Sequence, residues 1–89
     1  MKKSYSIRVS GKVQGVGFRF YTHKKANELE MKGFVKNMRD GSVYIEVEGN
    51  TGRMDEFISW VQHGPEWARV DKLSKQEKPF EDFDDFVIR

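Results

Sequence analysis

Residues 33–48 read GFVKNMRDGSVYIEVE, and this stretch decides how the rest of the chain folds. Residues 34–38 and 43–48 are rich in β-branched and aromatic side chains, and in the second run apolar and polar residues alternate. A period of two is typical of a strand with one buried face. Asp40-Gly41 between the runs favours a tight turn, because these residues adopt positive φ angles readily. The pattern predicts an antiparallel hairpin.

Two further elements are expected upstream of this hairpin. Residues 5–10 alternate in the same way and predict a strand that ends near Gly11. From Phe18 to about Met31 the pattern changes to helical spacing and predicts a moderately amphipathic helix, which Gly33 is expected to break. The residues of its inner stripe are Phe18, Thr22, Lys25, Ala26 and Leu29.

A second helix is expected downstream of the hairpin. Either Asn50 or Thr51 can cap its N-terminus, and Gly64-Pro65 is expected to end it. Apolar side chains recur at helical spacing between these signals, and Trp60 falls outside the stripe. The stripe residues are Met54, Phe57, Ile58 and Val61.

Two short strands complete the expected order of elements. One lies around Ala68 and Val70 and one at residues 86–88, with the acidic residues 81–85 as the connection. The order is that of an α+β, ferredoxin-like βαββαβ sandwich with an extra short C-terminal strand. We expect a single domain over residues 1–89, with two helices on one face of a mostly antiparallel sheet.

This topology brings two distant segments of the chain together. The first strand and the first strand of the hairpin are expected to be parallel, joined by a right-handed helical crossover, with the other hairpin strand between them. Their C-terminal ends then lie at the same edge of the sheet. Residues that follow Ser10 therefore become neighbours of residues near Asn37.

Composition limits the function classes. The 89 residues are 37% hydrophobic and 34% charged, as in ordinary globular proteins, and no cysteine is present for a disulfide, a thiolate nucleophile or a thiolate metal site. Exposed aromatic side chains on a sheet can bind RNA, and Tyr44, Trp67 and Phe80 are candidates for such positions. The net charge of +2, however, is far below the positive excess of a typical nucleic-acid-binding protein. No apolar run is long enough for a signal peptide. We expect a cytoplasmic monomer with no nucleic-acid or membrane partner.

The segment between the first strand and the first helix has the features of an anion site. Residues 11–19 read GKVQGVGFR, with three glycines in seven positions. Glycines allow a concave backbone whose N–H groups point inward at the positive end of a helix. Arg19 adds a forked cationic donor that matches phosphate oxygens. An ordinary strand-to-helix turn explains the same spacing, and neither the Walker loop nor the dinucleotide fingerprint is present.

Two motifs carry a more specific signal. They are Gly11-x-Val13-Gln14-Gly15-Val16-Gly17-Phe18-Arg19 and Gly33-x-Val35-x-Asn37-x-x-Asp40-Gly41-x-Val43. Together they resemble the two signatures of the acylphosphatase family, and the similarity continues to Phe86 and Ile88. Phe34 stands where the family usually has tryptophan and Lys12 where it usually has arginine. Neither is a catalytic position, so the departures leave the implied activity intact.

The resemblance implies hydrolysis of acyl phosphates to a carboxylate and inorganic phosphate. It implies that Arg19 and Asn37 are the catalytic residues, with Asn37 orienting the attacking water. The implied partners are a small-molecule acyl phosphate and inorganic phosphate, the latter as product and competitive ligand. We expect no cofactor and no metal. The phosphate-binding residues are expected to be Gln14, Gly15, Val16, Gly17, Phe18 and Arg19.

The residue types in the loop fit this substrate class. Residues 11–19 contain no histidine, cysteine or carboxylate, so no obvious general acid can protonate a leaving group. An alkoxide leaving group needs that proton, whereas a carboxylate has a conjugate-acid pKa of roughly 4 and departs unaided near neutral pH. The absence of an acid therefore favours an acyl phosphate over an alkyl phosphate.

Other interpretations stay open at the level of sequence. The main alternative function is a non-catalytic phosphate-binding or accessory ferredoxin-like module. His23 and His63 have no ligand partner at zinc-like spacing, which favours surface positions. Asp40 is a candidate base near Asn37, although the turn explains it fully. Residues 81–85 form a solvated acidic face or, less simply, a weak cation site.

Overall fold

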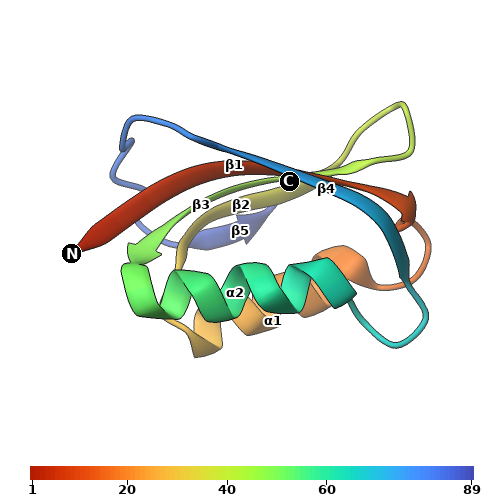
Figure 1. The fold of residues 1–89 in the computed structure, drawn as a ribbon, viewed down its shortest axis with the longest axis horizontal. Helices are drawn as coiled ribbons and strands as arrows, with labels where there is room; N and C mark the ends of the chain where they lie inside the picture. Colours follow the sequence, from red (N-terminus) through yellow and green to blue (C-terminus); the bar gives the residue numbers. More distant parts are fainter.

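The computed structural model describes residues 1–89 and confirms the expected order of elements. The five strands form one sheet in the order β4-β1-β3-β2-β5, and both helices cover the same face of it (Figure 1). This is the predicted α+β, ferredoxin-like arrangement. No helix is long and apolar enough to span a membrane. The elements are β1 (Lys2–Lys12), α1 (Phe18–Glu28), β2 (Lys32–Asn37), β3 (Val43–Asn50), α2 (Thr51–His63), β4 (Arg69–Glu77) and β5 (Phe86–Ile88).

Strand pairing places the two predicted segments at one end of the sheet. β3 pairs antiparallel with both β1 and β2, so β1 and β2 run in the same direction on either side of it. The loop that follows β1 and the hairpin loop that follows β2 emerge at the same end, on the right of Figure 1. The expected proximity of residues after Ser10 to residues near Asn37 is confirmed. β5 adds a parallel partner to the outer side of β2.

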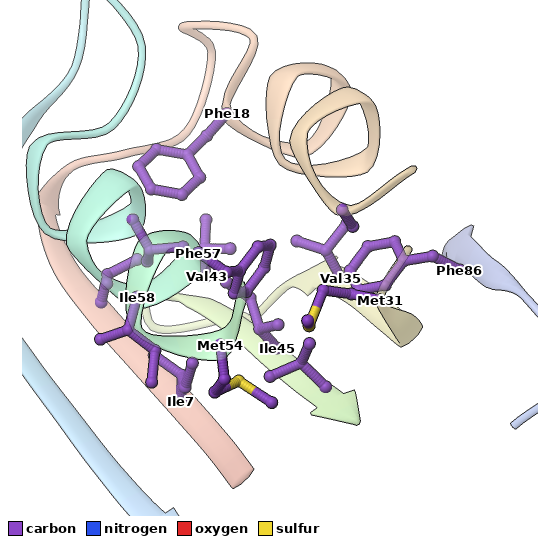
Figure 2. Close-up of a cluster of buried hydrophobic side chains, with 14 of the residues drawn as sticks. Ile7, Phe18, Met31, Val35, Val43, Ile45, Met54, Phe57, Ile58 and Phe86 are labelled. Atoms are coloured by element: carbon purple, nitrogen blue, oxygen red, sulfur yellow. The ribbon is translucent and has the colours of Figure 1, made fainter. Parts of the chain in front are cut away.

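The hydrophobic core lies between the sheet and the two helices. The apolar positions of the strand pattern, such as Ile7 and Ile45, point inward, as does the whole predicted stripe of α2 (Figure 2). Phe57 lies at the centre of this layer, and its ring meets that of Phe86 in an edge-on contact with centroids 6.3 Å apart. Burial of each such side chain stabilises the fold by about 1.5–3 kcal/mol. Asn50 caps α2 by accepting a hydrogen bond from the amide of Gly52.

The hairpin is confirmed, but its turn differs from the one expected. The amide of Met38 donates to the carbonyl of Ser42, so the loop consists of residues 39–41. Gly41 alone has a left-handed φ, of 93°, whereas Asp40 does not. A three-residue hairpin loop needs only one such residue, at its third position. Asp40 contributes through its side chain instead, which accepts hydrogen bonds from Ser42.

The first helix ends earlier than expected, and Gly33 is not what ends it. α1 stops at Glu28, and Glu30 takes a left-handed φ of 57°. The amides of Glu30 and Met31 turn back to the last helical carbonyls, the pairing of a Schellman motif. Gly33 lies inside β2, where a Cβ atom would collide with the carbonyl oxygen of Glu46. Close strand packing, and not helix termination, requires this glycine.

β4 is much longer than the predicted segment around Ala68 and Val70. It runs from Arg69 to Glu77 along the outer side of β1, with Tyr5 opposite Glu77. Most of its side chains are exposed and polar, because it is an edge strand. A strand of this kind lacks a clear apolar alternation. β1 likewise extends to Lys12, past a bulge at Ser10/Gly11.

Candidate active site

The loop between β1 and α1 is anchored at both ends by buried side chains. Val13 and Phe18 are 1% and 2% exposed, and the Phe18 ring contacts that of Trp60 with centroids 6.0 Å apart. Gly64, at the end of α2, makes room for this ring, since a Cβ there would lie 2.7 Å from Phe18 Cε2. The loop is therefore held in one place by core packing on either side.

The backbone amides of this loop are free of partners within the protein. Gly15 and Gly17 have φ angles of 74° and 79°, in the left-handed region that glycine adopts without strain. No backbone amide of residues 15–20 donates a hydrogen bond to another group of the protein. The first turn of α1 has neither a capping side chain nor an acidic residue. These amides and the positive end of the helix can together bind an anion.

Arg19 and Asn37 line one pocket at this end of the sheet. Its volume is about 260 Å³, and the backbone of Gly15 and Gly17 forms part of its wall. Arg19 is exposed and has no carboxylate within 4 Å, so its guanidinium is not neutralised by the protein. Asn37 is half-buried at the end of β2, and its side-chain amide makes no hydrogen bond within the protein. The pocket thus joins an unpaired cation, free amides and a free carboxamide.

Two residues of the predicted phosphate-binding loop do not line the pocket. The side chain of Gln14 turns away and donates to the carbonyl oxygens of Met38 and Ser42, at 2.8 and 2.9 Å. Val16 packs against the hydrophobic core. The pocket lining includes Gly15, Gly17, Phe18 and Arg19.

Asp40 lies beside Asn37 in sequence but is engaged in the turn. Its Oδ1 accepts from the amide and the hydroxyl of Ser42, at 2.9 and 2.6 Å. Arg8 reaches the same two residues, with Nη1 3.4 Å from Asp40 and 3.2 Å from Ser42 Oγ. The hydrogen bonds from Ser42 lower the pKa of Asp40 below its ordinary value, with a smaller effect of Arg8. These contacts favour the turn interpretation over a catalytic base.

The other candidates from the sequence take part in local structure. His23 lies within hydrogen-bond distance of Asn27, and His63, at the end of α2, of the carbonyl of Ser59. No three histidine, aspartate or glutamate side chains come close enough to bind a metal together. In the acidic segment, the amides of Glu81 and Phe83 donate to the carboxylate of Glu48.

Sequence reasoning gave no site role to three residues that line the pocket, namely Val13 of the loop motif, Phe20 and Ile88. Phe20 follows Arg19 on the first turn of α1, and Ile88 comes from β5, far away in the chain. Phe20 does give a signal, since it is a large apolar residue outside the stripe that α1 buries. Ile88 gives none, because its position depends on the parallel pairing of β5 with β2.

Comparison with known proteins identifies the family of this chain. The family model described as Acylphosphatase matches residues 5–88. The chain belongs to the acylphosphatase family. An acylphosphatase of Mannheimia succiniciproducens is 54% identical over 77 residues, which are 86% of this chain and 83% of that protein. One of Aliivibrio fischeri is 42% identical over 98% of this chain and 97% of its own length.

A solved acylphosphatase extends the similarity to three dimensions. The crystal structure of acylphosphatase from Bacillus subtilis superimposes with a TM-score of 0.95 at 36% sequence identity. The match covers 100% of this chain and 99% of the other. This chain thus has the same fold as the Bacillus subtilis acylphosphatase over residues 1–89.

Proposed function

We propose that the protein is an acylphosphatase that hydrolyses acyl phosphates to a carboxylate and inorganic phosphate. The observation that carries this proposal is the single pocket lined by Arg19 and Asn37 beside the free amides of residues 15–20, in a member of the acylphosphatase family. The alternative of a non-catalytic anion-binding module is not favoured, because relatives of nearly the same length are acylphosphatases.

Phosphate binding is assigned to the loop and to Arg19. The guanidinium donates two parallel hydrogen bonds to phosphate oxygens, and the amides of residues 15–19 bind the remaining ones. Gln14 belongs to the same loop, but its side chain bonds to the hairpin and so supports the loop instead of binding phosphate. Phosphoryl transfer needs positioning and stabilisation of charge on the equatorial oxygens. Arg19 and the helix N-terminus supply that positive charge, so the proposed reaction requires no metal ion.

The attacking water is assigned to Asn37. Its free carboxamide can donate to and accept from a water molecule, although it is too weak a base to remove the proton. The water oxygen forms a bond to phosphorus as the bond to the acyl oxygen breaks, and the electron pair leaves with the carboxylate. The proton of the water passes to a phosphate oxygen. No general acid is needed, because the leaving carboxylate is a weak base with a conjugate-acid pKa of roughly 4.

The proposal includes the finer expectations from the sequence. Residues 1–89 act as one domain, as a monomer and in the cytoplasm, with acyl phosphate and inorganic phosphate as small-molecule partners. The balanced charge and ordinary composition support this assignment. Light scattering after size-exclusion chromatography measures the oligomeric state directly, and a dimer mass would contradict the monomer.

A comparison of two phosphate compounds tests the proposed function. Benzoyl phosphate should be hydrolysed at least ~1000-fold faster than phenylethyl phosphate, an alkyl monoester whose alkoxide cannot leave without a proton. Inorganic phosphate should inhibit competitively. Equal rates for the two compounds would contradict the substrate class. Phosphate binding without any turnover would instead support the non-catalytic module.

A further inference from the structure

Two exposed apolar side chains lie in the pocket beside the polar groups. Phe20 is 59% exposed and Ile88 is 44% exposed, and both line the pocket that contains Arg19 and Asn37. Single apolar side chains on a surface are common and need no function. These two differ because they come from separate elements, α1 and β5, and meet at the same site. They give the pocket an apolar part that the binding of phosphate does not use.

Neighbouring structure contacts the Phe20 ring and fixes the backbone at Ile88. The ring of Tyr21 meets that of Phe20 in a T-shaped contact with centroids 5.1 Å apart. Ile88 lies opposite Val35 in the parallel pairing of β5 with β2, and the amide of Arg89 donates to the carbonyl of Val35 at 2.8 Å. Ile88 therefore lies alongside the strand that ends at Asn37. These contacts reduce the conformational freedom that the two residues lose when a ligand covers them.

We propose that Phe20 and Ile88 form an acyl site, which binds the hydrocarbon part of the acyl group. The proposal rests on the function proposed above and adds a substrate class: acyl phosphates with an aromatic or extended aliphatic acyl group. Contact with the acyl group removes apolar area of both partners from water, which favours binding in proportion to that area. An acetyl group is too small to cover both side chains, so acetyl phosphate gains less binding free energy from this contact.

The ratio of kcat/KM for benzoyl phosphate to that for acetyl phosphate measures this preference. Loss of one apolar contact in an enclosed pocket changes kcat/KM by about 10-fold or more. Because Phe20 and Ile88 are largely exposed, loss of either side chain should change kcat/KM by roughly 5-fold. Phe20→Ala and Ile88→Ala should each lower the ratio roughly 5-fold. Phe80→Ala is the matched control, because Phe80 is also exposed, at 48%, but lies in a hollow with Lys2 and Asn50 at the other end of β1 and β3. Its ratio should stay at the wild-type value.

A second measurement on the wild-type protein does not depend on how the variants fold. Methylphosphonate and benzylphosphonate carry the same kind of anionic group but differ in apolar size, and neither is hydrolysed. Benzylphosphonate should inhibit with a Ki roughly 5-fold or more below that of methylphosphonate. The two Ki values should become similar in Phe20→Ala.

The outcomes separate the acyl site from the proposed function. Unchanged ratios in both variants, or equal Ki values for the two phosphonates with wild type, would overturn the acyl site while hydrolysis of both acyl phosphates continued. A wild-type protein that hydrolysed neither acyl phosphate would overturn the proposed function itself, and the acyl site with it.

Discussion

The side-chain amide of Gln14 donates a hydrogen bond to the carbonyl oxygen of Met38 over 2.8 Å. The same nitrogen lies 2.9 Å from the carbonyl oxygen of Ser42. These bonds tie the loop before α1 to the residues on either side of the hairpin loop. Arg19 lies just after the first loop, in α1, and Asn37 lies just before the second, at the end of β2. The glutamine therefore controls how the phosphate-binding side of the pocket lies relative to the water-binding side.

Gln14→Leu should disturb this alignment more than it disturbs the fold. The substitution removes two hydrogen bonds from part-buried carbonyls, for a loss of about 1–3 kcal/mol in the free energy of unfolding. A displacement of about 1 Å between catalytic groups can lower the rate by about 100-fold, so kcat/KM for benzoyl phosphate should fall at least ~10-fold. Urea unfolding and steady-state kinetics measure the two effects. Gln62→Leu, on the exposed face of α2, is the matched control, and wild-type kcat/KM in Gln14→Leu would contradict the assigned role.

Substitutions of Asn37 and Arg19 should separate water positioning from phosphate binding. Asn37→Ala should lower kcat for benzoyl phosphate by about 100-fold or more while the Ki of inorganic phosphate stays nearly the same. Arg19→Ala should raise that Ki and also lower kcat, because the guanidinium contacts phosphate in both ground and transition states. The exposed Arg39→Ala controls for loss of positive charge nearby. Near-normal turnover in Asn37→Ala would exclude the water-orienting role.

Removal of metal ions should leave the activity intact. The positive charge at the site comes from Arg19 and from the N-terminus of α1, both of which are part of the chain. Dialysis against EDTA should therefore leave kcat/KM for benzoyl phosphate unchanged, and added Mg²⁺ should not raise it. Loss of activity in EDTA that a divalent ion restores would show that Arg19 and the helix N-terminus do not supply enough positive charge without a metal ion.

Two glycines should differ sharply in their tolerance of alanine. Gly33 has a φ of 141° and no room for a Cβ beside the carbonyl of Glu46, so Gly33→Ala should cost more than about 4 kcal/mol or prevent folding. Gly41 has a φ of 93° but open space around it, so Gly41→Ala should cost only about 1–2 kcal/mol in backbone strain. Denaturant unfolding of both variants measures the difference. Equal costs would show that packing against Glu46 is unimportant.

Tyr44 should make stability depend on pH in the alkaline range. Burial, together with a 2.7 Å hydrogen bond from its hydroxyl to Glu46, raises the pKa of Tyr44 to about 12, against roughly 10 in an unfolded chain. A raised folded pKa contributes stability that is complete below pH 10 and is lost as the pH rises towards 12. The free energy of unfolding should fall less over this range in Tyr44→Phe than in wild type. Tyr21→Phe is the control, because Tyr21 is exposed. If Tyr21→Phe reduced the pH dependence of the free energy of unfolding as much as Tyr44→Phe, the effect could not be assigned to Tyr44.

The parts of the fold that could be predicted are those with one buried face. The hairpin, β1 and α2 each bury a regular set of apolar residues, and the sequence period follows from that burial. Only the first residues of β4 were predicted, because an edge strand with exposed polar side chains has no such period. The end of α1 was misplaced because Glu30, and not a glycine, adopts the left-handed conformation.

The candidate site divides in the same way. Arg19 and Asn37 could be placed together from sequence, because strand order alone brings their two loops to one end of the sheet. Roles that depend on the direction of a side chain could not be predicted from the sequence. Gln14 belongs to the loop motif yet bonds to the hairpin, and Ile88 joins the pocket only through the pairing of β5.

The two edges of the sheet are protected against strand addition by different means. β5 is only three residues long, which gives an incoming strand little to pair with. β4 is nine residues long, but its exposed side chains carry charges of both signs, with Asp71 and Lys72 near one end and Lys75 and Glu77 near the other. Another chain that paired along this edge would have to bring its own side chains against these charges, so the edge discourages aggregation of the folded protein.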